Sequence, residues 1–226
     1  MKQFAKWGAW AAFVCGATYV FGFALMIGVL AESGYGTDGA DVDQILAFVT
    51  SHAGLMTIWN MSIYVLNGLA LAALAVCLSE VLRYEAPHAA PMIKTFGALW
   101  ATLVVGAGMV ANVGLAEVTR IYAEDPEGAR SLWQVVSIVE NGLGGGNEIA
   151  GGVWVLIVSA AAASSLRFSK ALAGFGAAVG LAGLLTFVPA LGDAAGAIFG
   201  LGFIVWFFWV AAVLGFKRSA AAVATA

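Results

Sequence analysis

Charged residues are scarce in this sequence. Only 10% of its 226 residues are Asp, Glu, Lys or Arg, whereas 62% are hydrophobic. Soluble domains carry roughly a quarter charged residues, so this composition excludes an ordinary soluble domain and indicates a lipid bilayer as the solvent. A basic excess is missing as well, because the net charge is −3. Nucleic-acid-binding proteins need a basic face, and nucleic acid is therefore excluded as a partner.

Histidine and cysteine are each present only twice. His52 and His88 are predicted to lie on opposite sides of the membrane, so they cannot share a metal ion. They are also too few for the axial pairs of a two-haem membrane cytochrome. Cys15 and Cys77 both fall toward the cytoplasmic leaflet, where reducing conditions disfavour a disulfide. We expect two free cysteines that act as small apolar residues, and the sequence indicates no particular cofactor.

Long apolar segments are what the sequence has in abundance. The mean hydropathy is +0.95, and six segments come near the ~20 residues that a spanning helix needs. Nothing between them resembles a soluble domain, so we predict a single all-α membrane domain over residues 1–226, a bundle of six transmembrane helices. The first segment is longer than the roughly 7–15 apolar residues of a signal peptide, and we expect it to remain uncleaved. The predicted spans are residues 7–30, 53–79, 95–116, 132–164, 171–189 and 194–216.

The basic residues predict the orientation of these spans. With the N-terminus in the cytoplasm, both termini and eight of the ten basic residues fall on the cytoplasmic side, as the positive-inside rule requires. Only Arg120 and Arg130 lie outside. The outer loops together carry the acidic residues Glu32, Asp38, Asp41, Asp43, Glu124, Asp125 and Glu127. The cytoplasmic basic residues are Lys2, Lys6, Arg83, Lys94, Arg167, Lys170, Lys217 and Arg218.

The first outer loop has two halves of different character. Its first half, "ESGYGTDGAD", is rich in glycine and aspartate and is expected to be irregular. Its second half places Val42, Ile45, Leu46 and Val49 at helical spacing, which predicts a short amphipathic helix. This helix would serve as an interfacial anchor or as a lid over an outward-facing cavity.

Small and aromatic residues pattern the last two spans. Gly176 with Gly180, and Gly196 with Gly200, have the spacing that lets membrane helices approach closely. The stretch "FIVWFFWV" at 203–210 is expected to be a lipid-facing or interfacial aromatic band. Contact with a pigment or quinone is the less ordinary alternative.

The fourth span, 132–164, departs most from an apolar helix. It is too long for a simple crossing, and its outer half reads "VENGLGGGNEIAGG". On a continuous helix its polar residues share one face, while Gly142 and Gly146 lie opposite, where another helix could press close. The glycines weaken the helix, so a kink or an unwound turn is expected at 142–146. The shared face comprises Glu140, Asn141, Gly144, Asn147, Glu148 and Gly151.

Two other spans place polar side chains at compatible depth. Asn60 and Asn67 lie seven residues apart in the second span and share a face with Tyr64, and Asn112 lies near the outer end of the third. Burying an ionised carboxylate in hydrocarbon costs several kcal/mol of free energy, so Glu148 and Glu140 would face a protein interior or a water-filled cavity. The alternative is that Glu140 is solvated among headgroups, while Glu148 and the asparagines only bond neighbouring helices.

Several stretches resemble a family of uncharacterised bacterial integral membrane proteins. They are the "ILAFVTSH" segment before the second span, the run "LALAALAVCLSEVLR", and "NEIAGGVWVLIVSAAAASSLRFSKALAGFGAAVGLAGLL". The resemblance covers most of the chain. It implies a six-helix protein of the bacterial inner membrane, and it brings no catalytic residues with it.

Three functional classes follow from these observations. The first is a protein that binds or translocates a small molecule or cation in an outward-facing pocket. The second is an accessory or structural subunit, with a membrane-protein partner or a second copy beside it in the bilayer. A membrane enzyme ranks last, because no second base and no ligand histidine accompany the carboxylates. The predicted lining residues are Glu148, Glu140, Asn147, Asn141, Asn60, Asn67 and Asn112.

Overall fold

The computed structural model describes residues 2–35, 41–145 and 148–216, and all of its regular structure is helical. Five of the described helices are long and apolar enough to cross a membrane: Lys2–Ser33, Ala53–Leu82, Ala89–Ile121, Pro126–Ala163 and Gly192–Phe216. The chain is therefore a multi-pass, all-α membrane protein, as its composition predicts.

Several of these long rods are built from more than one kind of helix. π-Helical segments interrupt or extend three of them, at Met26–Leu30, Met61–Leu66 and Asn141–Gly145. A short 3₁₀ turn, Ala31–Ser33, ends the first rod. The α-helices are α1 (Lys2–Leu25), α2 (Val42–Ser51), α3 (Ala53–Asn60), α4 (Asn67–Leu82), α5 (Ala89–Ile121), α6 (Pro126–Glu140), α7 (Ile149–Ala163), α8 (Lys170–Leu185) and α9 (Gly192–Phe216).

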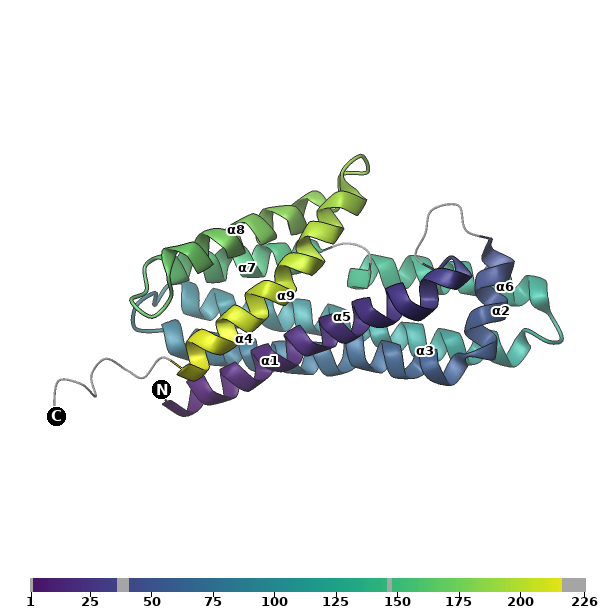
Figure 1. The fold of residues 1–226 in the computed structure, drawn as a ribbon, viewed down its shortest axis with the longest axis horizontal. Coiled ribbons are helices and arrows are strands. Elements are labelled where there is room, and N and C mark those ends of the chain that lie inside the picture. Colours follow the sequence, from purple (N-terminus) through teal and green to yellow (C-terminus); the bar gives the residue numbers. More distant parts are fainter. Residues whose placement is uncertain (1, 36–40, 146–147, 217–226) are drawn as a thin grey trace.

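The helices form an elongated bundle in which α5 runs along the long axis (Figure 1). The α3–α4 rod packs antiparallel to α5, α6 covers the half of α5 that ends at Ile121, and α7 lies against its other half. α8 and α9 form a hairpin that packs on α7 and on α1. The start of α1 and the end of α9 lie at the same end of the bundle (Figure 1).

The helix α8 is shorter than the prediction of six similar spans requires. It has 16 residues, below the length of the other apolar helices, and would rise about 24 Å against a hydrocarbon layer of about 30 Å. The turn after α8 consequently lies only part of the way along the bundle (Figure 1). The α8–α9 hairpin thus stops well short of the outer end reached by α3, α5 and α6.

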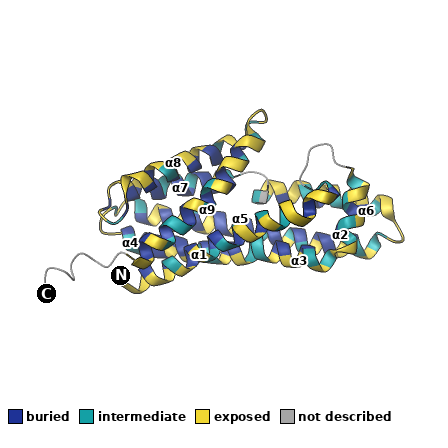
Figure 2. Cartoon of the chain, viewed as in Figure 1, coloured by how far each residue is buried: buried dark blue, intermediate teal, exposed yellow. Residues whose placement is uncertain are grey.

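An aromatic cluster fills the core between α5, α7 and α9. Phe203 stacks near Trp100 with ring centroids 5.3 Å apart, and Trp154 meets Trp206 at 5.7 Å. The Trp154 indole also donates a hydrogen bond to the Ile93 carbonyl at 3.0 Å. Figure 2 shows that much of α9 near this cluster is buried. The expectation of a lipid-facing band at 203–210 is therefore wrong for Phe203, Trp206 and Phe207, which are buried in the packing with neighbouring helices, whereas Phe208 and Trp209 are partly exposed.

Small residues bring α7 and α8 into close contact. A Cβ on Gly180 would stand 2.9 Å from the Gly152 carbonyl oxygen, and one on Gly176 would stand 2.4 Å from the Ser159 hydroxyl. This confirms the predicted role of Gly176 and Gly180 in close helix packing. Gly200 meets the ring of Phe23, but Gly196 has open space beside it, so the second predicted pair holds at only one position.

The predicted amphipathic helix in the first outer loop is present as α2. Asp41 caps it by accepting a hydrogen bond from the Asp43 amide, and Leu46 and Val49 are buried on its inner face. An ion pair between Asp43 and Arg130 of α6, at 3.2 Å, ties α2 across the outer end of the bundle. α2 thus packs on the protein itself, in a cluster with the ends of α5 and α6.

Candidate ligand-binding cavity

The polar stretch of the fourth span interrupts the helix instead of forming a polar face on a continuous helix. α6 ends at Glu140, and Gly144 adopts a positive φ of 131°, which interrupts the helical path before α7 begins at Ile149. The kink expected at 142–146 is confirmed. The single polar face is wrong, because Glu140 and Glu148 belong to two helices with different axes. Gly142 has no atom within 4 Å of a built Cβ, so no helix presses against it.

Glu148 stands at the N-terminal end of α7, next to the end of α8. Its backbone N–H donates a hydrogen bond to the Thr186 hydroxyl at 2.9 Å, and that hydroxyl donates to the Gly183 carbonyl at 2.7 Å. The Glu148 carbonyl lies against Gly183, where only a glycine leaves room for it. These contacts anchor the Glu148 backbone and leave its side chain to point elsewhere.

The depth of Glu148 follows from the contacts of its neighbours with α5. Gly151 packs on Trp100, and Leu143 approaches Gly106, so Glu148 lies level with the stretch of α5 between them. This stretch is ~17 to ~26 Å from Ala89, the first residue of α5. Glu148 therefore lies level with the middle of α5, which spans Ala89–Ile121.

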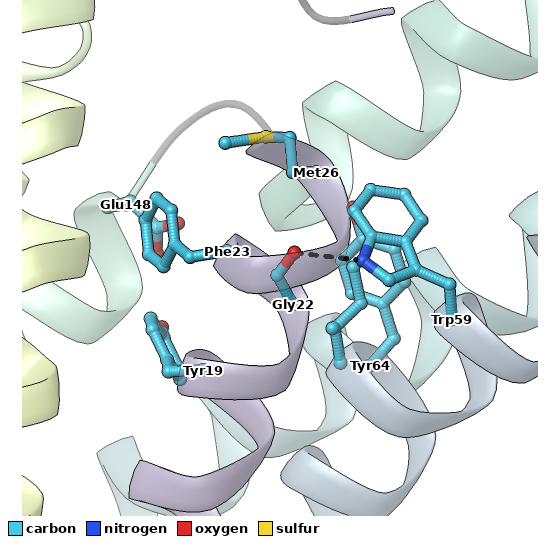
Figure 3. Close-up of a pocket in the computed structure, with 8 residues that line it drawn as sticks. Tyr19, Gly22, Phe23, Met26, Trp59, Tyr64 and Glu148 are labelled. Atoms are coloured by element: carbon cyan, nitrogen blue, oxygen red, sulfur yellow. Dashed lines mark hydrogen bonds between the residues drawn. The ribbon is translucent and has the colours of Figure 1, made fainter. Parts of the chain in front are cut away.

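A cavity of about 210 Å³ opens beside the Glu148 side chain. Its wall combines that one carboxylate with aromatic and apolar groups from α1 and from the α3–α4 rod (Figure 3). The Trp59 indole is fixed in the wall by a 3.2 Å hydrogen bond to the Gly22 carbonyl (Figure 3). The lining residues are Tyr19, Gly22, Phe23, Met26, Trp59, Ile63, Tyr64 and Glu148.

Two of the described π-helical segments contribute residues to the wall of this cavity. Met26 begins the first segment, and Ile63 and Tyr64 lie within the second. A π turn widens the helix and redirects its side chains, and such turns are frequent at functional sites. The third rod breaks at Gly144, a few residues before Glu148.

Tyr64 connects the cavity to the second carboxylate. It lines the cavity, and its hydroxyl donates a 2.7 Å hydrogen bond to Glu140 Oε1. Glu148 is also near enough to act electrostatically on the hydroxyls of Tyr64 and Tyr19. On the outer side, burial and then the negative charge of Glu140 raise the pKa of Tyr35, so its phenol stays protonated. Glu140 is thus buried among aromatic residues and is not solvated at the membrane surface.

The predicted asparagines are divided between different contacts. The Asn60 amide donates to Asn112 Oδ1 at 3.4 Å, linking the α3–α4 rod to α5. Asn67 instead bonds α1, donating to Thr18 Oγ1 at 2.7 Å and to the Cys15 carbonyl at 3.3 Å. Because the π turn between them shifts the register, Asn60, Tyr64 and Asn67 do not share a face as predicted. None of these asparagines lies in the cavity wall.

The remaining predicted site residues lie at the break itself. Asn141 is exposed in the third π-helical segment, away from the cavity wall. Asn147 lies outside the described residues. Of the seven residues predicted from the sequence, the structure brings Glu148 to the cavity wall and places Glu140 one hydrogen bond behind it.

Sequence reasoning missed the aromatic wall of the cavity. Tyr19, Phe23 and Met26 follow a spacing of four and three residues, which puts them on one face of the first span. Trp59 lies five residues before Tyr64 on the second. The face of the first span was a usable signal, but aromatic residues in apolar helices are common, and nothing local indicated that they face Glu148.

Metal-binding and redox features are not assembled in the described part of the chain. No group of three or more His, Cys, Asp or Glu residues there could hold a metal ion. Cys15 and Cys77 are buried and free, as expected. Comparisons with protein-family models, with curated proteins and with solved structures found no match to this chain.

Proposed function

We propose that this multi-pass membrane protein binds, or carries, a small molecule or cation in the cavity beside Glu148. The observation that carries the proposal is a carboxylate in the wall of an otherwise apolar and aromatic cavity, to which two π-helical segments contribute lining residues. A carboxylate at this depth is costly to bury and is retained where it serves a function. Glu140 supports the same site through Tyr64.

The topology that goes with this function has six crossings and both termini in the cytoplasm. The short helix α8 is the sixth crossing, because α7 and α9 run in the same sense on either side of it. Its outer turn reaches only the depth of Glu148, to which Thr186 is bonded. The hairpin therefore ends at the level of the cavity and does not cover that side of the bundle beyond it. A ligand could enter there from the outer half of the bilayer, which we take to be a bacterial inner membrane.

Native mass spectrometry of protein purified from membranes into lipid discs tests this proposal. The wild-type protein is expected to retain a small-molecule adduct, and Glu148→Gln to lose it. Asp193→Asn is the matched control, because Asp193 is an exposed carboxylate near the same outer turn, and it should keep the adduct. Equal retention by all three proteins, or a co-purifying membrane-protein chain in place of any small ligand, would contradict the proposal. The latter result would favour an accessory subunit.

A further inference from the structure

We infer that the ligand of this cavity carries an alkylated ammonium group, as in a small tertiary or quaternary amine. The inference rests on the proposed function and deepens it by naming the chemical class. It follows from the charge, the oxygen content, the aromatic content and the size of the cavity.

The charge of the cavity wall selects a cation. Among the described residues that line the wall, Glu148 is the single acidic one, and none is Lys, Arg or His. A second carboxylate, Glu140, stands behind the wall and is bonded to the Tyr64 hydroxyl. An anionic ligand would face two carboxylates without a compensating positive side chain among the described residues that line the site.

The shortage of oxygen atoms selects against a metal cation. Hard cations such as Ca²⁺ need about six to eight oxygen ligands, and Mg²⁺ needs an octahedral set. The side-chain oxygens of the described lining residues are those of the Glu148 carboxylate and of the Tyr19 and Tyr64 hydroxyls. The Tyr64 hydroxyl already donates to Glu140, and the Gly22 carbonyl already accepts the Trp59 indole. An alkylated ammonium group needs no oxygen cage, because its charge is spread over carbon-bound hydrogens and its hydration is weak.

The aromatic rings supply what such a group prefers. Tyr19, Phe23, Trp59 and Tyr64 all line the cavity, from two different rods. Cations are attracted to the faces of aromatic rings, and clusters of such rings recognise quaternary ammonium ligands. Met26 completes the wall with a polarisable thioether. A carboxylate on one side and rings on the others would hold the cation without replacing a tight hydration shell.

The size of the cavity limits the ligand. Its volume of about 210 Å³ is below the roughly 300–1,000 Å³ of sites that take drug-sized molecules. Tetramethylammonium and choline are small enough to be suitable probes, whereas tetrabutylammonium is a bulky comparison with the same charge. The same ammonium group could belong to a free solute or to a choline lipid headgroup, and the test separates the two.

Calorimetric titration of the protein in phosphatidylglycerol discs measures the binding of these probes. We expect tetramethylammonium and choline to bind, and tetrabutylammonium, sodium and the uncharged carbon analogue of choline to bind at least about tenfold more weakly. Glu148→Gln should weaken tetramethylammonium binding by about tenfold or more, because it removes the charge in the wall. If discs containing phosphatidylcholine suppress this binding, the lipid headgroup is the source of the ammonium group; if they do not, a free solute is.

A second pair of variants keeps the test independent of Glu148. Phe23→Leu removes a ring from the cavity wall, whereas Phe21→Leu removes an exposed ring from the same helix. Only Phe23→Leu should weaken tetramethylammonium binding, with both proteins eluting as the wild type does on gel filtration. Equal binding of the charged and uncharged choline analogues, or Glu148-dependent binding of sodium alone, would overturn the ammonium assignment and leave the proposed function standing. No probe binding together with no adduct in native mass spectrometry would overturn both.

Discussion

At the scale of single residues, two kinds of buried polar group can be told apart by what they contact. Asn67 directs both of its side-chain hydrogen bonds to α1, so its contacts are those of a packing residue. Glu148 has its backbone anchored to Thr186, while its side chain faces a cavity of aromatic groups. The first arrangement stabilises the fold, and the second costs free energy that a ligand would recover.

The cost of Glu148 leads to a prediction about stability. Replacing it by glutamine removes an ionisable group from apolar surroundings, so Glu148→Gln should leave the free energy of unfolding unchanged or raise it by up to ~2 kcal/mol. Thermal unfolding of ligand-free protein in detergent measures this change. A clear fall in the melting temperature would mean that the carboxylate supports the fold, which the account does not allow.

The opposite outcome is expected for Asn67. Asn67→Ala breaks the bond to Thr18 at 2.7 Å and should destabilise the protein by about 1 kcal/mol, without changing ligand binding. A double-mutant cycle with Thr18→Val measures the coupling, for which ~0.6 to ~1.7 kcal/mol is expected. A coupling near zero would show that this hydrogen bond contributes nothing to helix association.

At the scale of helices, close approach between α7 and α8 places the end of α8 next to Glu148. The glycines of α8 differ in what surrounds them, since Gly180 faces the backbone of Gly152 while Gly174 has open space. The same substitution at these two positions therefore has different consequences. This difference isolates packing from the general preference of helices for alanine.

Gly180→Ala should lower the free energy of unfolding by roughly 1–3 kcal/mol, because its Cβ would press on Leu156, Val155 and the Gly152 carbonyl. Gly174→Ala on the same helix should raise it by up to ~1 kcal/mol, since alanine favours the helix and meets no neighbour. Chemical denaturation in mild detergent compares the two. Similar effects of both substitutions would refute the close approach of α7 and α8 at Gly180.

The helices also show how far the sequence could lead. Apolar length predicted the α-helical class and most spans, and the spacing of Val42, Ile45, Leu46 and Val49 predicted α2. The break near Gly144 was predictable from glycine content, but its consequence for Glu140 and Glu148 was not. Periodicity assumes a constant 100° step, and π turns change that step. The facing of one helix toward another is a property of tertiary packing, which no local pattern in one sequence contains.

At the scale of the whole molecule, the end of the bundle formed by α2 and α6 extends beyond the α8–α9 hairpin. There α2, α3, α6 and the ends of α5 and of the first rod form a cap with its own buried cluster, Leu30, Leu46, Val49, Met56, Trp59, Leu115, Val118 and Ala129. Trp59 belongs both to this cluster and to the cavity wall. The cap therefore supports the side of the cavity formed by Trp59. The α8–α9 hairpin ends at the level of Glu148 and leaves the opposite side accessible.

The proposed orientation can be measured by thiol labelling. In a Cys15→Ser, Cys77→Ser background, a cysteine introduced at Glu85 should be protected from an impermeant reagent in intact cells, and one at Glu124 should react. These residues lie in loops at opposite ends of α5. Labelling of Glu85→Cys together with protection of Glu124→Cys would show that the orientation is opposite to the proposed one.

A high-resolution cryo-electron microscopy map of the protein purified from native membranes would show whether the cavity holds a ligand. Non-protein density is expected inside the cavity, within contact distance of the Glu148 carboxylate and of the rings of Tyr19, Phe23, Trp59 and Tyr64. The same density should be absent from a map of Glu148→Gln with an unchanged fold. A cavity filled by side chains, or sealed by a partner chain that contacts Glu148, would contradict this expectation.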